Sequence, residues 1–293
     1  MLSCASSVNP KEPQPIRSWN PTVISHRYHR IFDGGKSSIL HDLQNTVHAL
    51  VHDFSSGFTE KDLTLAHYFG NRKLFFLEIM KDAAFSPIKD PVISMGGLIG
   101  GEARKLCEFH DLGKSLCGNV LGKGITYAMA TLETNASMGL IVASPTAGSA
   151  GIVPGMMLAL QEVYGFSDKK IRQALFNAGA IGYLAMRNAT VAGAVGGCQA
   201  EVGIASAMAA SAAVELLGGT PLQCTYAAST VLMNMLGLVC DPVGGLVEYP
   251  CQNRNAAGVS NALIAAEMSL AGIPQFIPLD EMIDAIVAFQ LQR

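Results

Sequence analysis

Charged and aromatic side chains are both scarce in this sequence of 293 residues. Charged residues make up 15% of the chain and aromatic residues 7%, and the formal net charge is −3 at pH 7. A chain with no basic excess is poorly suited to nucleic acid or to an anionic membrane, and we expect neither as a partner. The apolar content comes mainly from small and aliphatic side chains, with 30 glycines, which indicates closely packed backbones.

Long apolar segments and secretion signals are also missing. Residues 135–161 carry no charge, yet Pro145, Pro154 and several glycines interrupt them, so we expect no membrane span. Residues 1–15 lack a basic segment followed by an apolar core, so no secretory signal is expected. The chain has seven cysteines, an odd number, which argues against a disulfide framework. Together these absences predict a cytoplasmic protein.

Strand patterns are absent as well, because no run of alternating β-branched residues reaches any length. The sequence predicts a mainly α fold, a compact helical domain with small-residue helix packing and glycine-rich active-site loops. Residues 1–90 are expected to form a divergent, partly irregular N-terminal region with helices, and residues 91–293 a helical catalytic domain. The predicted helices cover residues 38–53, 60–84, 120–139, 153–164, 168–186, 200–217, 220–237, 255–271 and 279–291.

Three of the cysteines stand at predicted turns: Cys198 in GGCQAEVG, Cys240 in GLVCDPVGG and Cys251 in EYPCQNRNA. Glycines allow a backbone to approach a bulky inorganic group, and proline often flanks a cluster-ligating cysteine. Three thiolates would leave one metal position open, which is typical of catalytic sites. The spacing matches no short CxxC pattern, so three buried thiols are the alternative on the residues alone.

A segment rich in glycine, serine and threonine, SPTAGSAGIVPG, covers residues 144–155 and leads into a predicted helix. Successive backbone amides in such a turn, together with a helix N-terminus, bind a small anion. No GK[ST] follows, so a carboxylate rather than a phosphate is the natural ligand. A flexible loop between helices is the alternative. The candidate substrate-binding residues are Thr146, Gly148, Ser149, Gly151 and Asn188.

Five segments resemble the α chain of iron–sulfur-dependent L-serine dehydratase, an L-serine ammonia-lyase: SPTAGSAGIVPG, NATVAGAVGGCQAEVGIASAMAA, LLGGTP, LGLVCDPVGGLVEYPCQNRNA and LAGIP…IPLDEMIDA. The resemblance covers about residues 90–290. It implies that Cys198, Cys240 and Cys251 hold a [4Fe–4S] cluster, which makes residues 91–293 an iron–sulfur catalytic domain. It also implies a lyase that converts L-serine to pyruvate and ammonia without pyridoxal phosphate.

The resemblance further implies a mechanism and a partner. An open iron of the cluster would act as a Lewis acid for the serine hydroxyl, while the 144–155 loop holds the substrate carboxylate. The residues assign no general base, and the resemblance implies that a β-type chain completes the site. Some relatives carry a tail cysteine that reaches the cluster, and no cysteine follows Cys251 here. The alternatives are a catalytically impaired or structural remnant of the family, or a related cluster-dependent hydro-lyase or desulfidase.

Overall fold

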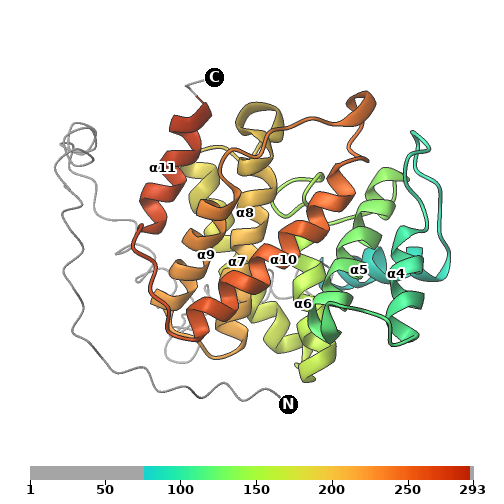
Figure 1. The fold of residues 1–293 in the computed structure, drawn as a ribbon, viewed down its shortest axis with the longest axis horizontal. Coiled ribbons are helices and arrows are strands. Elements are labelled where there is room, and N and C mark those ends of the chain that lie inside the picture. Colours follow the sequence, from blue (N-terminus) through green and yellow to red (C-terminus); the bar gives the residue numbers. More distant parts are fainter. Residues whose placement is uncertain (1–75, 291–293) are drawn as a thin grey trace, which may run out of the picture. The chain divides into compact units, whose positions relative to one another are not determined.

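The computed structural model describes residues 76–290. By its internal contacts the chain divides into two units, Met1–Ser38 and Ile39–Arg293, and every described residue belongs to the second unit. The described residues contain no strand, so the predicted mainly α fold is confirmed. Helical residues 76–89 precede the elements labelled in Figure 1, which are α4 (Glu102–Asp111), α5 (Gly118–Ala136), α6 (Ile152–Tyr164), α7 (Asp168–Asn188), α8 (Gly193–Leu216), α9 (Pro221–Met235), a short 3₁₀ turn (Val243–Gly245), α10 (Cys251–Leu270) and α11 (Leu279–Gln290).

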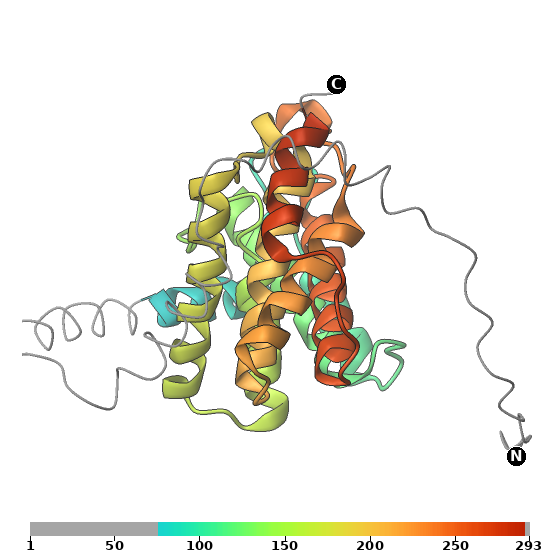
Figure 2. The ribbon, with the colours of Figure 1, turned by 90° about the vertical axis from the view of Figure 1, so that its left-hand side faces the viewer.

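Helix α8 lies at the centre of this helical unit. It contacts α6, α7, α9 and α10, and Figure 2 shows it between α7 on one side and α9 and α10 on the other. Every residue from Val202 to Val214 is buried, and six of these thirteen residues are alanine. A helix that is apolar on all sides belongs in a core. Within the described part of the chain, however, no helix combines the length and apolar character needed to cross a membrane.

Helices α5 and α6 approach each other through glycine. A side chain on Gly155 would begin 2.7 Å from the carbonyl oxygen of Gly124, and one on Gly124 would begin 2.8 Å from Val259 of α10. Because the atom opposite Gly155 belongs to the packed backbone, that position requires glycine, whereas a side chain at Gly124 would displace the Val259 side chain. This contact fixes the start of α6, where the 144–151 loop enters the helix.

The helix ends follow their sequence signals, except at the starts of α8 and α10. Thr220 and Gln223 form a reciprocal capping box before α9, and Pro221 is its first helical residue, as the sequence predicts. Helix α8 begins at Gly193, earlier than the predicted residue 200, and it bends at Gly197, where φ is 72° and ψ is 176°. Gly197 separates two helical segments within α8, so the long segment after the break begins close to the predicted residue 200. Helix α10, in contrast, begins at Cys251, earlier than the predicted residue 255.

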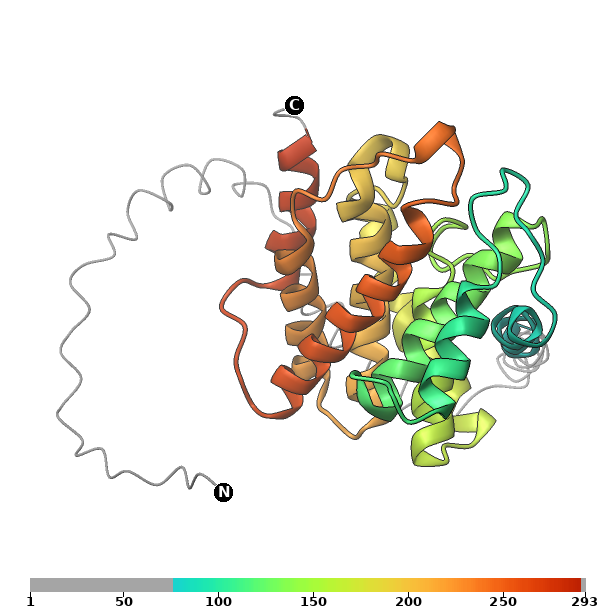
Figure 3. The same ribbon diagram turned by 45° about the vertical axis from the view of Figure 1, so that its right-hand side comes forward.

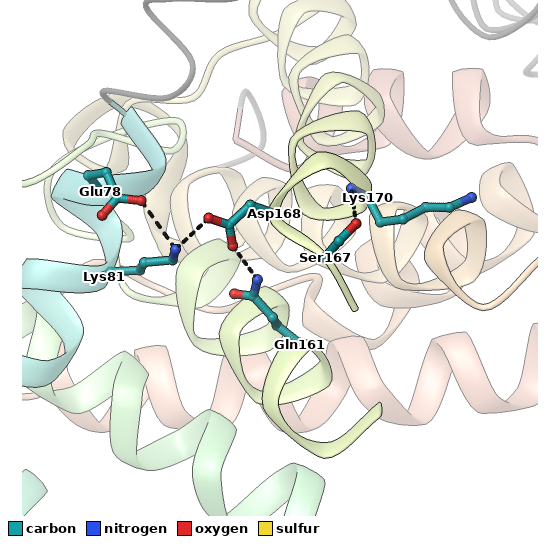
Figure 4. Close-up of polar contacts among 6 residues, drawn as sticks. All are labelled: Glu78, Lys81, Gln161, Ser167, Asp168 and Lys170. Atoms are coloured by element: carbon teal, nitrogen blue, oxygen red, sulfur yellow. Dashed lines mark hydrogen bonds and ion pairs between the residues drawn. The ribbon is translucent and has the colours of Figure 1, made fainter. Parts of the chain in front are cut away.

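Helix α7 is anchored at its first turn, as Figure 4 shows. Ser167 accepts a hydrogen bond from the amide of Lys170 (3.4 Å) and caps the helix. Asp168 accepts hydrogen bonds from Lys81 (2.8 Å) and from Gln161 of α6 (2.6 Å). These two hydrogen bonds, with that from Lys81 first, lower the pKa of the Asp168 carboxyl. The contact with Lys81 attaches the helical residues before α4 to the body of the unit.

Residues 76–89 therefore share the core of the helices that follow them. Leu77 and Ala84 are buried in the same apolar cluster as α6, α7 and α8. The predicted helix over residues 60–84 agrees with the structure over residues 76–84. The predicted helix over residues 38–53 and the rest of the predicted N-terminal region lie outside the described residues.

Long loops lie toward one end of the helices. The loops of residues 91–101 and 236–250 run close together there, as Figure 3 shows, and a hydrogen bond from Ser94 to Glu248 joins them. The 137–151 loop is hydrogen-bonded to Asn255 of α10. The same end holds the first turn of α8 and the first turn of α10. All of the sequence-predicted site residues except Asn188 come from these loops and helix starts.

Candidate functional site

The bend in α8 places Cys198 against the segment that carries Cys240. A side chain on Gly197 would begin 2.9 Å from the carbonyl oxygen of Leu238, so only glycine allows this close approach. The amide of Gln199 donates to the same Leu238 oxygen (2.9 Å), and the Gln199 side chain accepts from the amide of Gly237 (2.8 Å). The two cysteine-bearing segments are thereby joined backbone to backbone.

Arg254, on the second turn of α10, links these segments through its side chain. Its Nη1 donates to Cys198 Sγ (3.2 Å) and to the carbonyl oxygen of Val239 (2.9 Å). The same nitrogen forms an ion pair with Asp241 Oδ1 (2.5 Å). The guanidinium therefore sits between the residues on both sides of Cys240 and the sulfur of Cys198, where its positive charge stabilises a thiolate.

Cys251 begins α10 and completes the set of three thiols. Burial raises the pKa of Cys198 to about 12, and the opposing hydrogen bond from Arg254 does not offset this. Burial, followed by the negative charge of Glu201, raises the pKa of Cys251. The exposed Cys240 contributes to both shifts, so the three sulfurs share one electrostatic environment. The raised pKa values of Cys198 and Cys251 favour their protonated thiols at neutral pH, and a metal centre would reverse that preference.

The glycine-rich loop is bound to α10 by one buried amide side chain. Asn255, which is 0% exposed, donates to the carbonyl oxygens of Gly148 (2.8 Å) and Cys251 (2.9 Å). Its Oδ1 accepts from the amide of Gly151 (3.0 Å). Asn255 thus holds the predicted substrate loop at a set position relative to the first turn of α10, which carries Cys251.

Glu201, one turn after Cys198 on α8, faces the same loop. The hydroxyl of Thr146 donates to Glu201 Oε1, and Thr146 lies 3.0 Å from the hydroxyl of Ser149. A side chain on Gly148 would begin 2.6 Å from Glu201 Oε1. A side chain on Gly193 would meet the other carboxylate oxygen. Glycine at both positions leaves room for this carboxylate between the loop and the start of α8.

Comparison with known proteins decides the family. Residues 37–291 match the family described as serine dehydratase alpha chain. The chain belongs to this family. The match confirms the resemblance seen in the five sequence segments, and it begins well before residue 90, where the resemblance was expected to start.

Individual members of the serine dehydratase alpha chain family are close to this chain. The chain is 53% identical over 205 residues to a probable L-serine dehydratase, alpha chain, of Bacillus subtilis (strain 168), covering 70% of this chain and 68% of that one. It is 47% identical over 210 residues to the L-serine dehydratase, alpha chain, of Peptoniphilus asaccharolyticus, covering 72% of each. A Streptomyces coelicolor L-serine dehydratase is 46% identical over 147 residues, which are 50% of this chain and 32% of that protein. The Streptomyces relative therefore extends far beyond the region it shares with this chain.

The donor set of this serine dehydratase family member suits a cluster better than a single ion. Among residues 76–290, no three histidine, cysteine, aspartate or glutamate side chains lie close enough together to hold one metal ion. A four-iron cluster spreads its cysteine ligands more widely than one ion does, so this finding concerns single-ion sites. Cys198, Cys240 and Cys251 form an all-sulfur set beside one guanidinium, and soft thiolates select iron–sulfur clusters.

The predicted substrate residues differ in their surroundings. Thr146, Gly148, Ser149 and Gly151 lie together in the loop that Glu201 and Asn255 contact. Asn188 is exposed at the end of α7, where its side chain donates to the carbonyl oxygen of Leu184 in its own helix (2.9 Å). Substrate binding by Asn188 stays a prediction, and no contact in the structure adds to it.

A second buried carboxylate joins the loops of the site to each other. Glu248, which is 3% exposed, accepts hydrogen bonds from the hydroxyl of Ser94 (2.6 Å) and from the amides of Gly96 (2.6 Å) and Leu98 (3.2 Å). The 94–106 segment thus forms a loop held against the cysteine-bearing segment, followed by α4.

Sequence reasoning missed Glu201 and Glu248 and gave no role to Arg254 or Asn255. The spacing offered one usable signal, because residues three or four apart share a helix face. Glu201 follows Cys198 by three residues, while Arg254 and Asn255 follow Cys251 by three and four. Nothing local indicates that Glu248 binds a loop about 150 residues earlier in the sequence.

Proposed function

We propose that this chain is the alpha chain of an iron–sulfur-dependent L-serine ammonia-lyase, which eliminates water from L-serine to give pyruvate and ammonia. The observation that carries the proposal is the junction of two sites. Asn255 and Glu201 join the glycine-rich loop to the helices that bear Cys251 and Cys198. Family membership supports the reaction class, because the relatives are named L-serine dehydratase.

The three cysteines would hold a [4Fe–4S] cluster, with no pyridoxal phosphate. When bound, this cluster would supply an iron with an open position, a Lewis acid suited to the serine hydroxyl as a leaving group. Arg254 would stabilise the negative charge of Cys198 and hold Cys198 and Cys240 at a set separation. Asn255 would keep the substrate loop in register with Cys251.

The loop of residues 144–151 would bind the substrate carboxylate through its backbone amides and hydroxyl groups. Fixing the carboxylate orients the Cα–H bond, so that one base can remove this proton and return it to the departing hydroxide, which leaves as water. The product, 2-aminoacrylate, tautomerises to an imine, and water hydrolyses the imine to pyruvate and ammonia.

The base and the partner belong to the same proposal. His110 is the single histidine in the described part of the chain, and it lies against Gly122 of α5. We propose that a β-type chain supplies the base and completes the site. The Streptomyces relative, which extends far beyond the shared region, supports this, since one chain there has room for both parts. A cytoplasmic location stays a prediction.

The test is cluster content measured together with turnover. After anaerobic reconstitution we expect about four iron and four sulfide per chain, and loss of both in Cys198→Ser, Cys240→Ser and Cys251→Ser. Cys117→Ser is the matched control, because Cys117 is an exposed cysteine that makes none of these contacts. L-Serine should yield pyruvate when a β-type chain is present. A folded wild-type chain that forms no cluster would overturn the proposal.

A further inference from the structure

The loop of residues 144–151 contains donors that the protein itself does not satisfy. Among the described residues, the backbone amides of residues 146–149 donate to no acceptor. The hydroxyl of Ser144, a residue that is 6% exposed, also has no partner. Gly148 and Ser149 are buried, and buried amides in native proteins are nearly always paired. This loop therefore has the hydrogen-bonding capacity to receive an acceptor from a ligand.

The carboxylate of Glu201 lies directly beside these donors. Thr146, within the same run, donates its hydroxyl to Glu201 Oε1, and Gly148 lies against that oxygen. A negative ligand bound by the amides alone would be repelled by Glu201, since like charges at short range are unfavourable. A ligand that carries a positive group next to its negative group would be attracted by both sides of the site.

We infer that Glu201 binds the α-ammonium group of the amino-acid substrate, whose carboxylate is held by the amides of residues 146–149. This assignment rests on the proposed function and adds to it a residue that selects amino acids over hydroxy acids. Charge complementarity is the reason, because an α-amino acid presents a carboxylate and an ammonium on adjacent atoms. The free amides donate hydrogen bonds to the carboxylate, and the negative charge of Glu201 attracts the ammonium.

The residues around Glu201 orient its carboxylate and leave space next to it for the ammonium group. The hydrogen bond from Thr146 orients the carboxylate, and glycine at positions 148 and 193 leaves its oxygens uncovered by side chains at those two positions. Its place one turn after Cys198 puts the ammonium site next to the predicted metal ligands. The three functional groups of serine, its hydroxyl, ammonium and carboxylate, thus have neighbouring sites on one face of this chain.

The decisive experiment compares two ligands on the full chain with its cluster reconstituted. L-Serine carries all three groups, whereas 3-hydroxypropanoate keeps the carboxylate and the hydroxyl but lacks the ammonium. Titration calorimetry would measure both affinities in the wild type, in Glu201→Gln and in Glu201→Asp. The glutamine variant keeps an oxygen that accepts from Thr146 but loses the charge. Glu267→Gln, which removes an exposed glutamate from α10, is the control for net charge.

We expect the wild type to prefer L-serine and Glu201→Gln to lose that preference. Affinity for L-serine should fall by about 10- to 100-fold, the range for losing one charge-assisted hydrogen bond. Affinity for 3-hydroxypropanoate should stay the same or rise, and Glu201→Asp should retain part of the preference. Iron and sulfide contents should match the wild type, since Glu201 is not a predicted ligand.

Two results would overturn this assignment while the proposed function stands. One is an unchanged preference for L-serine in Glu201→Gln. The other is an equal loss of affinity for both ligands, which would mean that Glu201 only shapes the loop. A wild-type chain that forms its cluster but gives no pyruvate from L-serine with a β-type chain present would instead overturn the proposed function, and this assignment with it.

Discussion

Residues 202–214 and residues 193–198 belong to the same helix, α8, but have opposite surroundings. The first segment is buried among α6, α7, α9 and α10, and alanine is its commonest residue. The second contains three glycines and a bend, and it carries Cys198 to the loop end of the molecule. Dense packing of small side chains makes the body of the helix rigid. This rigid body holds the first turns of α8, and with them Cys198, in a fixed position at the site.

The largest effect is expected at the loop end of the molecule, from the removal of Arg254. Its side chain links Cys198 of α8 to the segment that carries Cys240. Arg254→Met loses two charge-assisted hydrogen bonds and an ion pair, together worth roughly 3 kcal/mol or more. We expect at least about a hundredfold lower rate of pyruvate formation and a reduced iron content. Arg172→Met, a loss of charge on α7, is the control. Wild-type iron content and turnover in Arg254→Met would contradict the role assigned to it.

The same substitution at the two ends of α8 tests the difference in packing. Ala209 is 0% exposed in the core, whereas Ala194 is exposed in the first turn. Ala209→Leu must push neighbouring helices apart, and we expect it to lower the free energy of unfolding by about 2–3 kcal/mol. Ala194→Leu should change it by less than about 0.5 kcal/mol. Urea unfolding of both variants measures these changes in free energy. Equal changes would show that the two segments of α8 do not differ in packing.

Glu248→Gln tests whether the loops of the site depend on one buried carboxylate. The amide group of glutamine would face donors from Ser94, Gly96 or Leu98, so we expect a loss of about 1–3 kcal/mol of unfolding free energy at pH 7. Amide hydrogen exchange should also speed up in residues 94–99. Unchanged exchange there would show that other contacts hold the loop.

The pH dependence of the unfolding free energy of wild type and Glu248→Gln tests the direction of the Glu248 pKa shift. Burial alone would raise the pKa of Glu248, but the hydrogen bonds from Ser94, Gly96 and Leu98 outweigh it, and the pKa is lowered in the folded chain. Its stabilisation is therefore present above the unfolded value of about 4.3 and is lost as pH falls through the lower folded value. The stability difference between wild type and Glu248→Gln should shrink below about pH 4. A constant difference across urea titrations at each pH would contradict this.

The smallest expected effect lies in the helical body, far from the site. Thr220→Ala removes one half of the capping box of α9, which we expect to cost about 1 kcal/mol of unfolding free energy. Cluster content and serine affinity should not change, because Thr220 contacts no residue of the site. Gln223→Ala removes the other half of the same motif and should have a similar effect. A change in cluster content would mean that the two regions are coupled through α9.

Much of the fold was predictable because its signals are local. Proline, glycine and capping residues mark the ends of α7 and α9, and the small-residue pattern predicts close helix packing. The sequence places the start of the long helical segment of α8 at residue 200, close to the break at Gly197, but it does not show why the chain breaks there. The contact of Gly197 with Leu238 decides this, and it joins segments that lie 41 residues apart in sequence.

The features of the candidate site also fall into those that the sequence predicts and those that only the structure shows. The sequence by itself determined the mainly α class, the three cysteines at glycine and proline turns, and the loop of residues 144–155, because each is written in neighbouring residues. Only the tertiary structure placed Glu201 beside Thr146, Asn255 between Gly148 and Cys251, and Arg254 on Cys198. Such pairings depend on how helices rotate and cross when their small side chains pack, and packing is a property of the whole core rather than of any one segment.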